Sequence, residues 1–185
     1  MKTPALLLLS CLSFSLWASP APLLEAEARH AVQALAGRLQ EEMHAALNTG
    51  GAQAAIASCN AQALPLTEQI SREQGLIIRR TALRVRNPAN NPDPWETRVL
   101  ESFVARQQVG QPLKGMSFSE LVEENGQRYF RMLQAIPTQN QCLECHGSEL
   151  APEIEAKLNQ LYPNDRARGF SAGDLRGAFS IRRLL

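Results

Sequence analysis

Residues 118–136, Phe-Ser-Glu-Leu-Val-Glu-Glu-Asn-Gly-Gln-Arg-Tyr-Phe-Arg-Met-Leu-Gln-Ala-Ile, decide the fold class of this chain. Two runs rich in apolar and aromatic residues flank the pair Asn125-Gly126. An Asn-Gly pair supplies both positive-φ residues of a type I′ turn, the tight turn that joins two antiparallel strands. We therefore predict a β-hairpin with strands at 118–124 and 127–136, which argues against an all-helical fold.

The segments around the hairpin supply helices and two further strands. Apolar residues recur at helical spacing over 24–47 and 52–70, and the polar, glycine-rich residues 48–51 separate these two helices. Pro65 marks either a kink in the second helix or the start of a new one. The other predicted elements are a strand at 76–86, a proline-rich loop at 87–94, helices at 95–109 and 151–161, and a last strand at 178–182. This order predicts an α+β domain, an antiparallel sheet with the helices on one side.

The N-terminus has the pattern of a secretory signal peptide. Lys2 is followed by an uncharged, largely apolar run over residues 5–17 and then by the small residues Ala18 and Ser19. The apolar run is too short to span a bilayer. We predict a signal peptide at 1–18, export to the periplasm, and no stable membrane insertion after cleavage. Lipid anchoring at Cys11 is the alternative, disfavoured because the apolar region continues well past this cysteine.

The composition bounds the rest of the chain. Residues 19–185 are predicted to form a single domain, which is long enough to bury a hydrophobic core. The whole chain has 19 Lys and Arg residues against 18 Asp and Glu residues. Because these charges nearly cancel and no basic tail is present, nucleic acid is not an expected partner. Most of the cations are arginines, which bind carboxylates in a bidentate manner.

Residues 142–146, Cys-Leu-Glu-Cys-His, have the spacing of a c-type haem attachment motif. The two thiols add to the haem vinyl groups, and the adjacent histidine reaches the iron. Half of a zinc site is an alternative, but it requires a second pair of ligands at workable spacing. A thioredoxin-type redox pair needs no adjacent histidine. We predict one covalent haem c, attached at Cys142 and Cys145 and ligated by His146.

The cysteine count draws attention to Cys59. The chain has four cysteines, so removal of Cys11 with the signal peptide and use of two by the haem leave one unpaired. Helical phase places Cys59 on the core face of the second helix. It is either a buried free cysteine or a ligand on the other side of the iron. The remaining candidate ligands are His30, His44, Met116 and Met132. A surface or packing role is favoured for the two histidines and a core role for Met132.

Three arginines are candidate partners of the haem propionates. Alternation along 76–86 would place Arg80, Arg84 and Arg86 on one face of a strand. Such a face either is solvated or pairs with the two propionates. The sequence alone does not separate these two interpretations.

Three stretches of the chain together resemble a family of monohaem c-type cytochromes. They are Arg-Val-Arg-Asn-Pro-Ala-Asn-Asn-Pro-Asp-Pro-Trp-Glu at 84–96, Cys-Leu-Glu-Cys-His-Gly at 142–147, and Tyr-Pro-Asn-Asp…Gly-Asp-Leu-Arg-Gly-Ala-Phe-Ser-Ile at 162–181. The resemblance covers nearly the whole mature chain. It implies a PAS-like fold and an iron held by the motif histidine and by a cysteine thiolate from an N-terminal helix. His146 and Cys59 match these two positions, and the family also occurs as an exported sensor module in front of histidine kinases.

A haem with these ligands is expected to have a low potential, because a thiolate donates electron density and favours the ferric state. Reduction of the iron, or protonation of the thiolate, should weaken the iron–sulfur bond and open a coordination position for a small gas. We therefore expect a periplasmic redox or gas sensor that works by ligand exchange and signals to a partner protein. The alternative is a low-potential electron-transfer cytochrome c with a redox partner. No Ser-His-Asp set or paired acid–base constellation suggests an enzyme.

Overall fold

The computed structural model describes residues 21–185, so the predicted signal peptide at 1–18 and the candidate lipid site Cys11 lie outside the described residues. The elements are α1 (Ala21–Gln74), β1 (Ile77–Thr81), η1 (Pro88–Asn90), α2 (Pro94–Gln108), β2 (Ser117–Glu124), β3 (Gln127–Pro137), η2 (Asn140–Cys142), α3 (Leu143–His146), α4 (Pro152–Leu161) and β4 (Leu175–Leu184). The strands form one antiparallel sheet with the order β1-β4-β3-β2. The α+β class predicted from the sequence is confirmed. No helix among residues 21–185 has the length and apolar character needed to cross a membrane.

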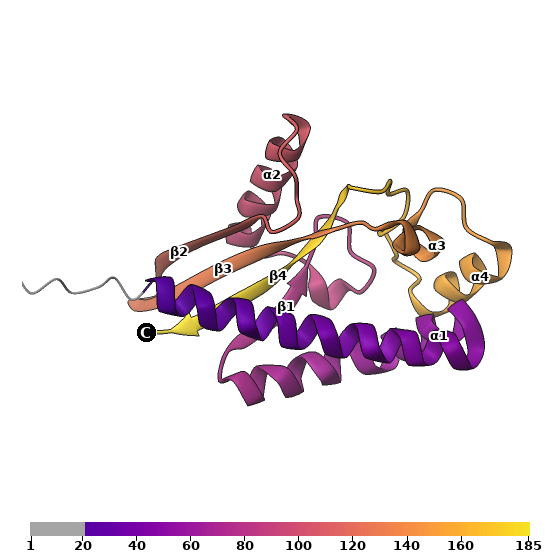
Figure 1. Cartoon of the computed structure of the whole chain (residues 1–185), viewed down its shortest axis with the longest axis horizontal. Coiled ribbons are helices and arrows are strands. Elements are labelled where there is room, and N and C mark those ends of the chain that lie inside the picture. The colour runs from indigo at the N-terminus through magenta and orange to yellow at the C-terminus, as the bar shows by residue number, and fades with distance from the viewer. Residues whose placement is uncertain (1–20) are drawn as a thin grey trace, which may run out of the picture.

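Helix α1 is a hairpin of two helical halves rather than one straight rod (Figure 1). Gly50 and Gly51 have non-helical dihedral angles, and Gly51 has a φ of 66°, a conformation that glycine adopts without steric cost. The halves are joined side by side by the side chains of Ser58 and Glu42 and by a 3.2 Å contact between His30 Nδ1 and Gln74 Oε1. The predicted break at 48–51 is therefore confirmed, and it turns the second half back along the first.

Two hydrophobic cores cover opposite faces of the sheet. The first half of α1 packs Leu35 and its apolar neighbours against Met132 and Ile181, which are paired across β3 and β4. Helix α2 packs Leu100 and its neighbours against Leu133, which points to the other face because strand side chains alternate. The prediction that the helices lie on one side of the sheet was wrong: α2 covers the second face, while α1 covers the first (Figure 1).

The hairpin forms as predicted, with φ values of 54° at Asn125 and 74° at Gly126. The predicted strand at 76–86, however, ends at Thr81. Beyond this residue the backbone turns to the loop that follows α4, where Val85 O accepts a 2.9 Å hydrogen bond from Arg166 N. A long-range backbone contact therefore replaces the continued strand pairing. The last strand is longer than predicted and spans Leu175–Leu184.

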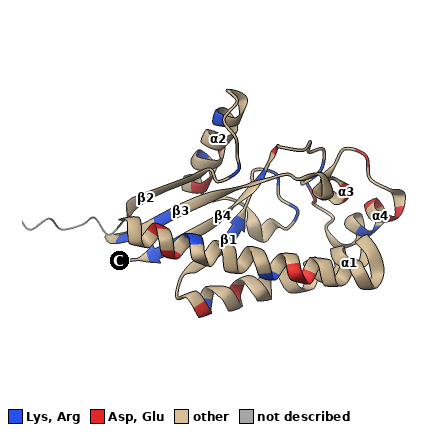
Figure 2. Ribbon diagram, viewed as in Figure 1, with Lys and Arg blue, Asp and Glu red and all other residues tan. Residues whose placement is uncertain are grey.

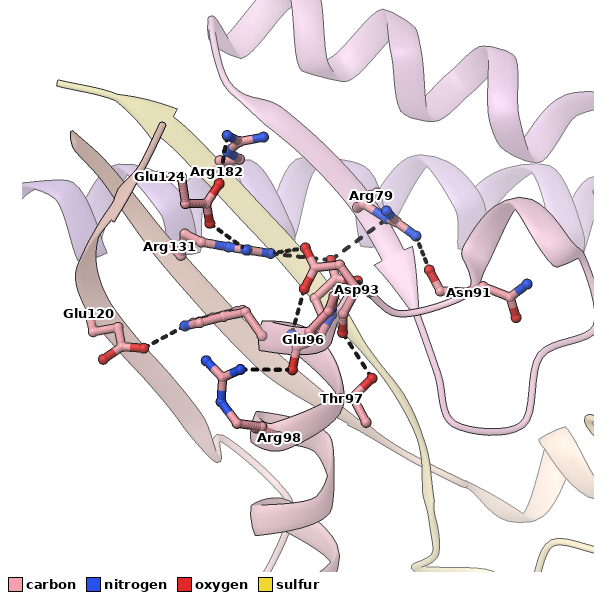
Figure 3. A network of polar contacts seen from close by, with 12 residues as sticks. Arg79, Asn91, Asp93, Glu96, Thr97, Arg98, Glu120, Glu124, Arg131 and Arg182 are labelled. Carbon is pink, nitrogen blue, oxygen red and sulfur yellow. Dashed lines mark hydrogen bonds and ion pairs between the residues drawn. The ribbon is translucent and has the colours of Figure 1, made fainter. Parts of the chain in front are cut away.

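A buried ion-pair network fixes the start of α2 to the sheet (Figure 3). The Asp93 carboxylate accepts a 2.7 Å hydrogen bond from Glu96 N, and the Glu96 carboxylate accepts a 3.0 Å bond from Asp93 N, forming a capping box. Arg131 on β3 lies 2.5 Å from Asp93 and 2.9 Å from Glu124, and its guanidinium stacks on Trp95. Because Arg131 and Glu96 are almost fully buried, breaking this network would leave charges without partners.

Asp93→Ala should lower the free energy of unfolding by about 1–2 kcal/mol, since it removes a helix cap and one partner of buried Arg131. Urea unfolding followed by circular dichroism at neutral pH measures this change. Asp93→Asn is the matched control, because its amide oxygen can still cap α2 while the charge is lost. A wild-type unfolding midpoint in Asp93→Ala would contradict the assigned role.

The same carboxylate should contribute to acid sensitivity. Burial alone would raise the pKa of Asp93, but hydrogen bonds from the backbone of Glu96 and from Arg131 outweigh it and lower this pKa below its usual value. A carboxyl with a depressed folded-state pKa stabilises the fold above its unfolded pKa, and this contribution is lost as the pH falls through the folded value. Asp93→Asn should therefore unfold with a shallower dependence on pH in the acid range, which urea titrations at several pH values would detect.

Candidate functional site

The cysteine-histidine motif lies where β3 leaves the sheet, on η2 and the short helix α3. Cys142 and Cys145 are half-buried and form no disulfide with any cysteine of residues 21–185. The loop before β4 braces the motif, because Phe170 N donates a 3.0 Å hydrogen bond to His146 O. Gly147 follows at a tight turn, where an added Cβ would lie 2.6 Å from Leu143 O. The local backbone therefore presents both thiols and the histidine from one turn.

His146 is held in the tautomer that a metal requires. Its Nδ1 lies 2.7 Å from Ala167 O, and because a carbonyl only accepts, Nδ1 carries the proton. Burial, reinforced by the positive charges of Arg176 and Arg86, lowers the pKa of His146 to about 3, so the ring is neutral at physiological pH. A neutral imidazole whose Nδ1–H is committed to a carbonyl offers the Nε2 lone pair to a metal. The residue fits the role of an iron ligand.

Arg176, at the start of β4, is the charged side chain that the sequence reasoning missed. Its Nε lies 3.4 Å from His146 Nε2, and its guanidinium lies 5.3 Å from the centre of the Phe170 ring. Burial, together with Arg86 and Arg80, lowers the pKa of Arg176 to about 10, so it remains a cation at neutral pH. The available signal was its place in the stretch 162–181, where it stands between Leu175 and Gly177.

The structure brings Cys59 to this site from the second half of α1. Ile56, one turn earlier, packs against α4, and Cys145 borders the same apolar cluster. Burial raises the pKa of the Cys59 thiol, while the positive charges of Arg80 and Arg86 oppose that shift. Burial likewise raises the pKa of the Cys145 thiol, Arg86 opposes this, and Cys59 is close enough to add to it. The third sulfur that the cysteine count singled out therefore lies one helical turn from Ile56, which belongs to a cluster that Cys145 borders.

The three predicted arginines all lie near the motif but in different roles. Arg86 is already engaged: it lies 3.2 Å from Asp165 and donates to the carbonyl of Cys145. Arg84 is exposed, donates a 3.0 Å hydrogen bond to Arg168 O, and stacks 3.7 Å from the centre of the Phe170 ring. Arg80 is half-buried and has no ion-pair partner within residues 21–185. They do not share one strand face, because the strand ends before Arg84.

Asp165 is the acidic residue that orders this cluster. Burial would raise its pKa, but Arg86, the backbone N–H of Ala167 and Arg168 together lower it, so the group is a carboxylate at neutral pH. It therefore binds Arg86 and Arg168 at the same time, at 3.2 Å and 3.0 Å. By holding Ala167 N as well, at 2.8 Å, it fixes the residue whose carbonyl orients His146. The sequence did not single out Asp165 either, because its partner Arg86 is distant along the chain.

The other candidate ligands lie elsewhere. His30 and His44 are exposed on α1, while Met116 and Met132 are buried in the cores on the two faces of the sheet. Within residues 21–185 no group of three or more His, Cys, Asp or Glu side chains could hold a bare metal ion. A haem iron needs no such group, because the porphyrin supplies four of its ligands and the protein adds one or two.

Acidic and basic side chains lie on different sides of the motif, so an anionic group would be favoured on the basic side. A surface hollow next to Glu144 is lined by Glu149 and Glu153 as well as by Gly50 and Gly51. Three carboxylates would repel the haem propionates there. The arginines come from β1, the loop that follows it and the start of β4, and several basic segments lie between the sheet and α3 (Figure 2). Their positive charge suits two carboxylates.

Comparisons with known proteins identify the family of the chain. No curated protein matches the chain. Among solved structures, the crystal structure of the cyanobacterial heme-protein Tll0287 is similar, with 26% sequence identity, a TM-score of 0.62, and coverage of 90% of this chain and 97% of that chain. The family described as Tll0287-like matches residues 22–183, and these residues include all three arginines, Cys59 and the motif. The chain therefore belongs to the Tll0287-like family.

Proposed function

We propose that this protein is an exported monohaem c-type cytochrome. Cys142 and Cys145 would attach the haem covalently, and His146 and Cys59 would ligate its iron. The observation that carries the proposal is the state of His146, a neutral ring with Nδ1–H bonded to Ala167 O and an unprotonated Nε2, within a Cys-x-x-Cys-His motif. A structural relative at 26% identity is a heme-protein, which supports the same cofactor.

When bound, the haem would supply a one-electron iron couple and a coordination position that a small gas can occupy. Groups of the chain would orient the histidine ligand and favour the thiolate form of the cysteine ligand. Ala167 O holds the imidazole in one orientation, and the Asp165 carboxylate holds Ala167. Cys59 must lose its proton to bind iron as a thiolate, and the nearby Arg80 and Arg86 favour that anionic form against the effect of burial.

The placement of Cys59 favours redox or gas sensing by ligand exchange. Cys59 lies on the half of α1 that leads directly into β1, so its binding or release acts on a helix packed against the sheet. The same half contacts α4 through Ile56. A change at Cys59 would therefore alter how the helical hairpin packs on a PAS-like sheet, which a signalling partner protein can read. This role requires no catalytic group of the protein.

A low-potential electron carrier is the second candidate function. The observation that favours it is the position of Cys142 and Cys145, which are only half-buried. A cofactor attached there would lie near the surface, where a redox partner could approach it. In this case Cys59 would stay bound in both oxidation states.

The test is spectroscopy of the protein after co-expression with haem-attachment machinery and export to the periplasm. We expect covalently bound haem, a six-coordinate low-spin ferric signal by optical and EPR spectroscopy, and a ferrous form that binds carbon monoxide. Carbon monoxide binding with loss of the thiolate signal supports sensing, whereas a ferrous form that excludes it supports electron transfer. Absence of covalent haem from the exported wild-type protein would overturn the proposal.

A further inference from the structure

We infer that Arg176 is an exchangeable partner of the site. Its guanidinium lies beside His146 Nε2, and we expect it to bind a haem propionate and to raise the midpoint potential once haem is attached. This inference rests on the proposed function, since it concerns a residue that would contact the proposed cofactor. It assigns a propionate partner that lies outside the predicted set Arg80, Arg84 and Arg86.

The lone pair of His146 Nε2 can serve only one partner at a time. In this structure the partner is Arg176, whose Nε donates across 3.4 Å, which is long for a hydrogen bond and therefore weak. The other ring nitrogen is committed to Ala167 O at 2.7 Å. Binding of iron to Nε2 therefore requires Arg176 to release this atom. Because the contact is long and weak, breaking it costs little free energy.

Once released, Arg176 needs an anion. Within residues 21–185 it has no carboxylate partner, and its other polar contact is a 3.4 Å hydrogen bond to Arg84 O. The nearest acidic group of the cluster, Asp165, already binds Arg86 and Arg168. Arg176 is half-buried and lies among other arginines, so its charge has no ion-pair partner within residues 21–185. A haem propionate is the anion that the proposed cofactor brings to this place.

The neighbouring arginines are less suited to this exchange. Arg86 is held by Asp165 and by the carbonyls of Cys145 and Ala167, so moving it would break the support of the motif. Arg84 lies flat on the Phe170 ring at 3.7 Å and is exposed, so its charge is already solvated. Arg176 contacts the same ring from 5.3 Å, and Phe170 also meets His146 edge-on at 6.2 Å. Arg176 and His146 therefore both contact one aromatic ring beside the motif.

The experiment compares the haem-loaded wild-type protein with Arg176→Gln, Arg176→Lys and the control Arg106→Gln. Arg106 carries the same charge on α2, where it bonds Gln111 away from the motif. Removing a cation beside a propionate stabilises the ferric state, so Arg176→Gln should shift the midpoint potential to more negative values. Arg176→Lys should restore the potential in part, and Arg106→Gln should match the wild type. Spectroelectrochemical titration measures the midpoint potential of all four proteins.

A second readout keeps the inference testable if Arg176→Gln fails to fold. The propionate bending band in resonance Raman spectra reports hydrogen bonding to the propionates, and it should differ between wild type and Arg176→Lys. An unchanged potential in Arg176→Gln, or an unchanged band in Arg176→Lys, overturns the inference while the covalent haem of the wild type leaves the proposed function standing. A wild-type protein without covalent haem overturns both.

Discussion

Replacing both Cys142 and Cys145 with serine should abolish covalent haem attachment, which is the largest effect expected from any change in this chain. Each thiol forms one thioether bond, and a serine hydroxyl does not add to a vinyl group under the same conditions. The fold should survive, because Cys145 contacts Arg86 through its backbone carbonyl, which serine retains. Haem staining after denaturing electrophoresis and the mass of the intact protein measure the loss.

The matched control for this double variant is Cys59→Ser in the same host. Cys59 lies outside the motif, so its loss should leave the covalent bond and the mass increase intact. Single Cys142→Ser and Cys145→Ser variants should show reduced attachment through one remaining bond. Covalent haem in the double variant would mean that the motif is not the attachment site, whatever else the protein binds.

Replacing Cys59 with serine should remove the six-coordinate low-spin ferric spectrum. A neutral hydroxyl donates far less electron density than a thiolate, so the midpoint potential should also rise. The change is small in volume. Ile56, one turn earlier on α1, packs in an apolar cluster with Tyr162, and both residues should stay in place. Optical and EPR spectra of the ferric protein, with a redox titration, provide the measurement.

Gln62→Ser is the control for this variant, since Gln62 is exposed on the same half of α1 and the change introduces the same side chain. It should leave the spectrum and the potential of the wild type unchanged. A low-spin ferric spectrum that persists in Cys59→Ser would assign Cys59 to the other interpretation, a buried free cysteine that serves only packing. His146 would then share the iron with a different ligand, and ligand exchange at Cys59 would no longer explain sensing.

Much of the fold could be predicted because its signals are local. Asn125-Gly126 specifies a tight turn through the φ angles that two neighbouring residues can adopt, and the hairpin forms there. Gly50 and Gly51 likewise end one helical half through backbone conformation. The end of β1 at Thr81 was not predictable in this way. Val85 is β-branched and has strand propensity, but its carbonyl bonds to Arg166 N, which is remote in sequence.

For the site, the motif at 142–146 could be recognised and Cys59 selected from the sequence, because spacing along a helix or turn sets which atoms share a side. The tertiary structure, in contrast, sets how the charges are distributed. It committed Arg86 to Asp165, left Arg84 on the surface, and placed Arg176 against His146. The physical reason is distance along the chain: local geometry follows from neighbouring residues, whereas a partner on another element becomes visible only after the sheet and helices have packed.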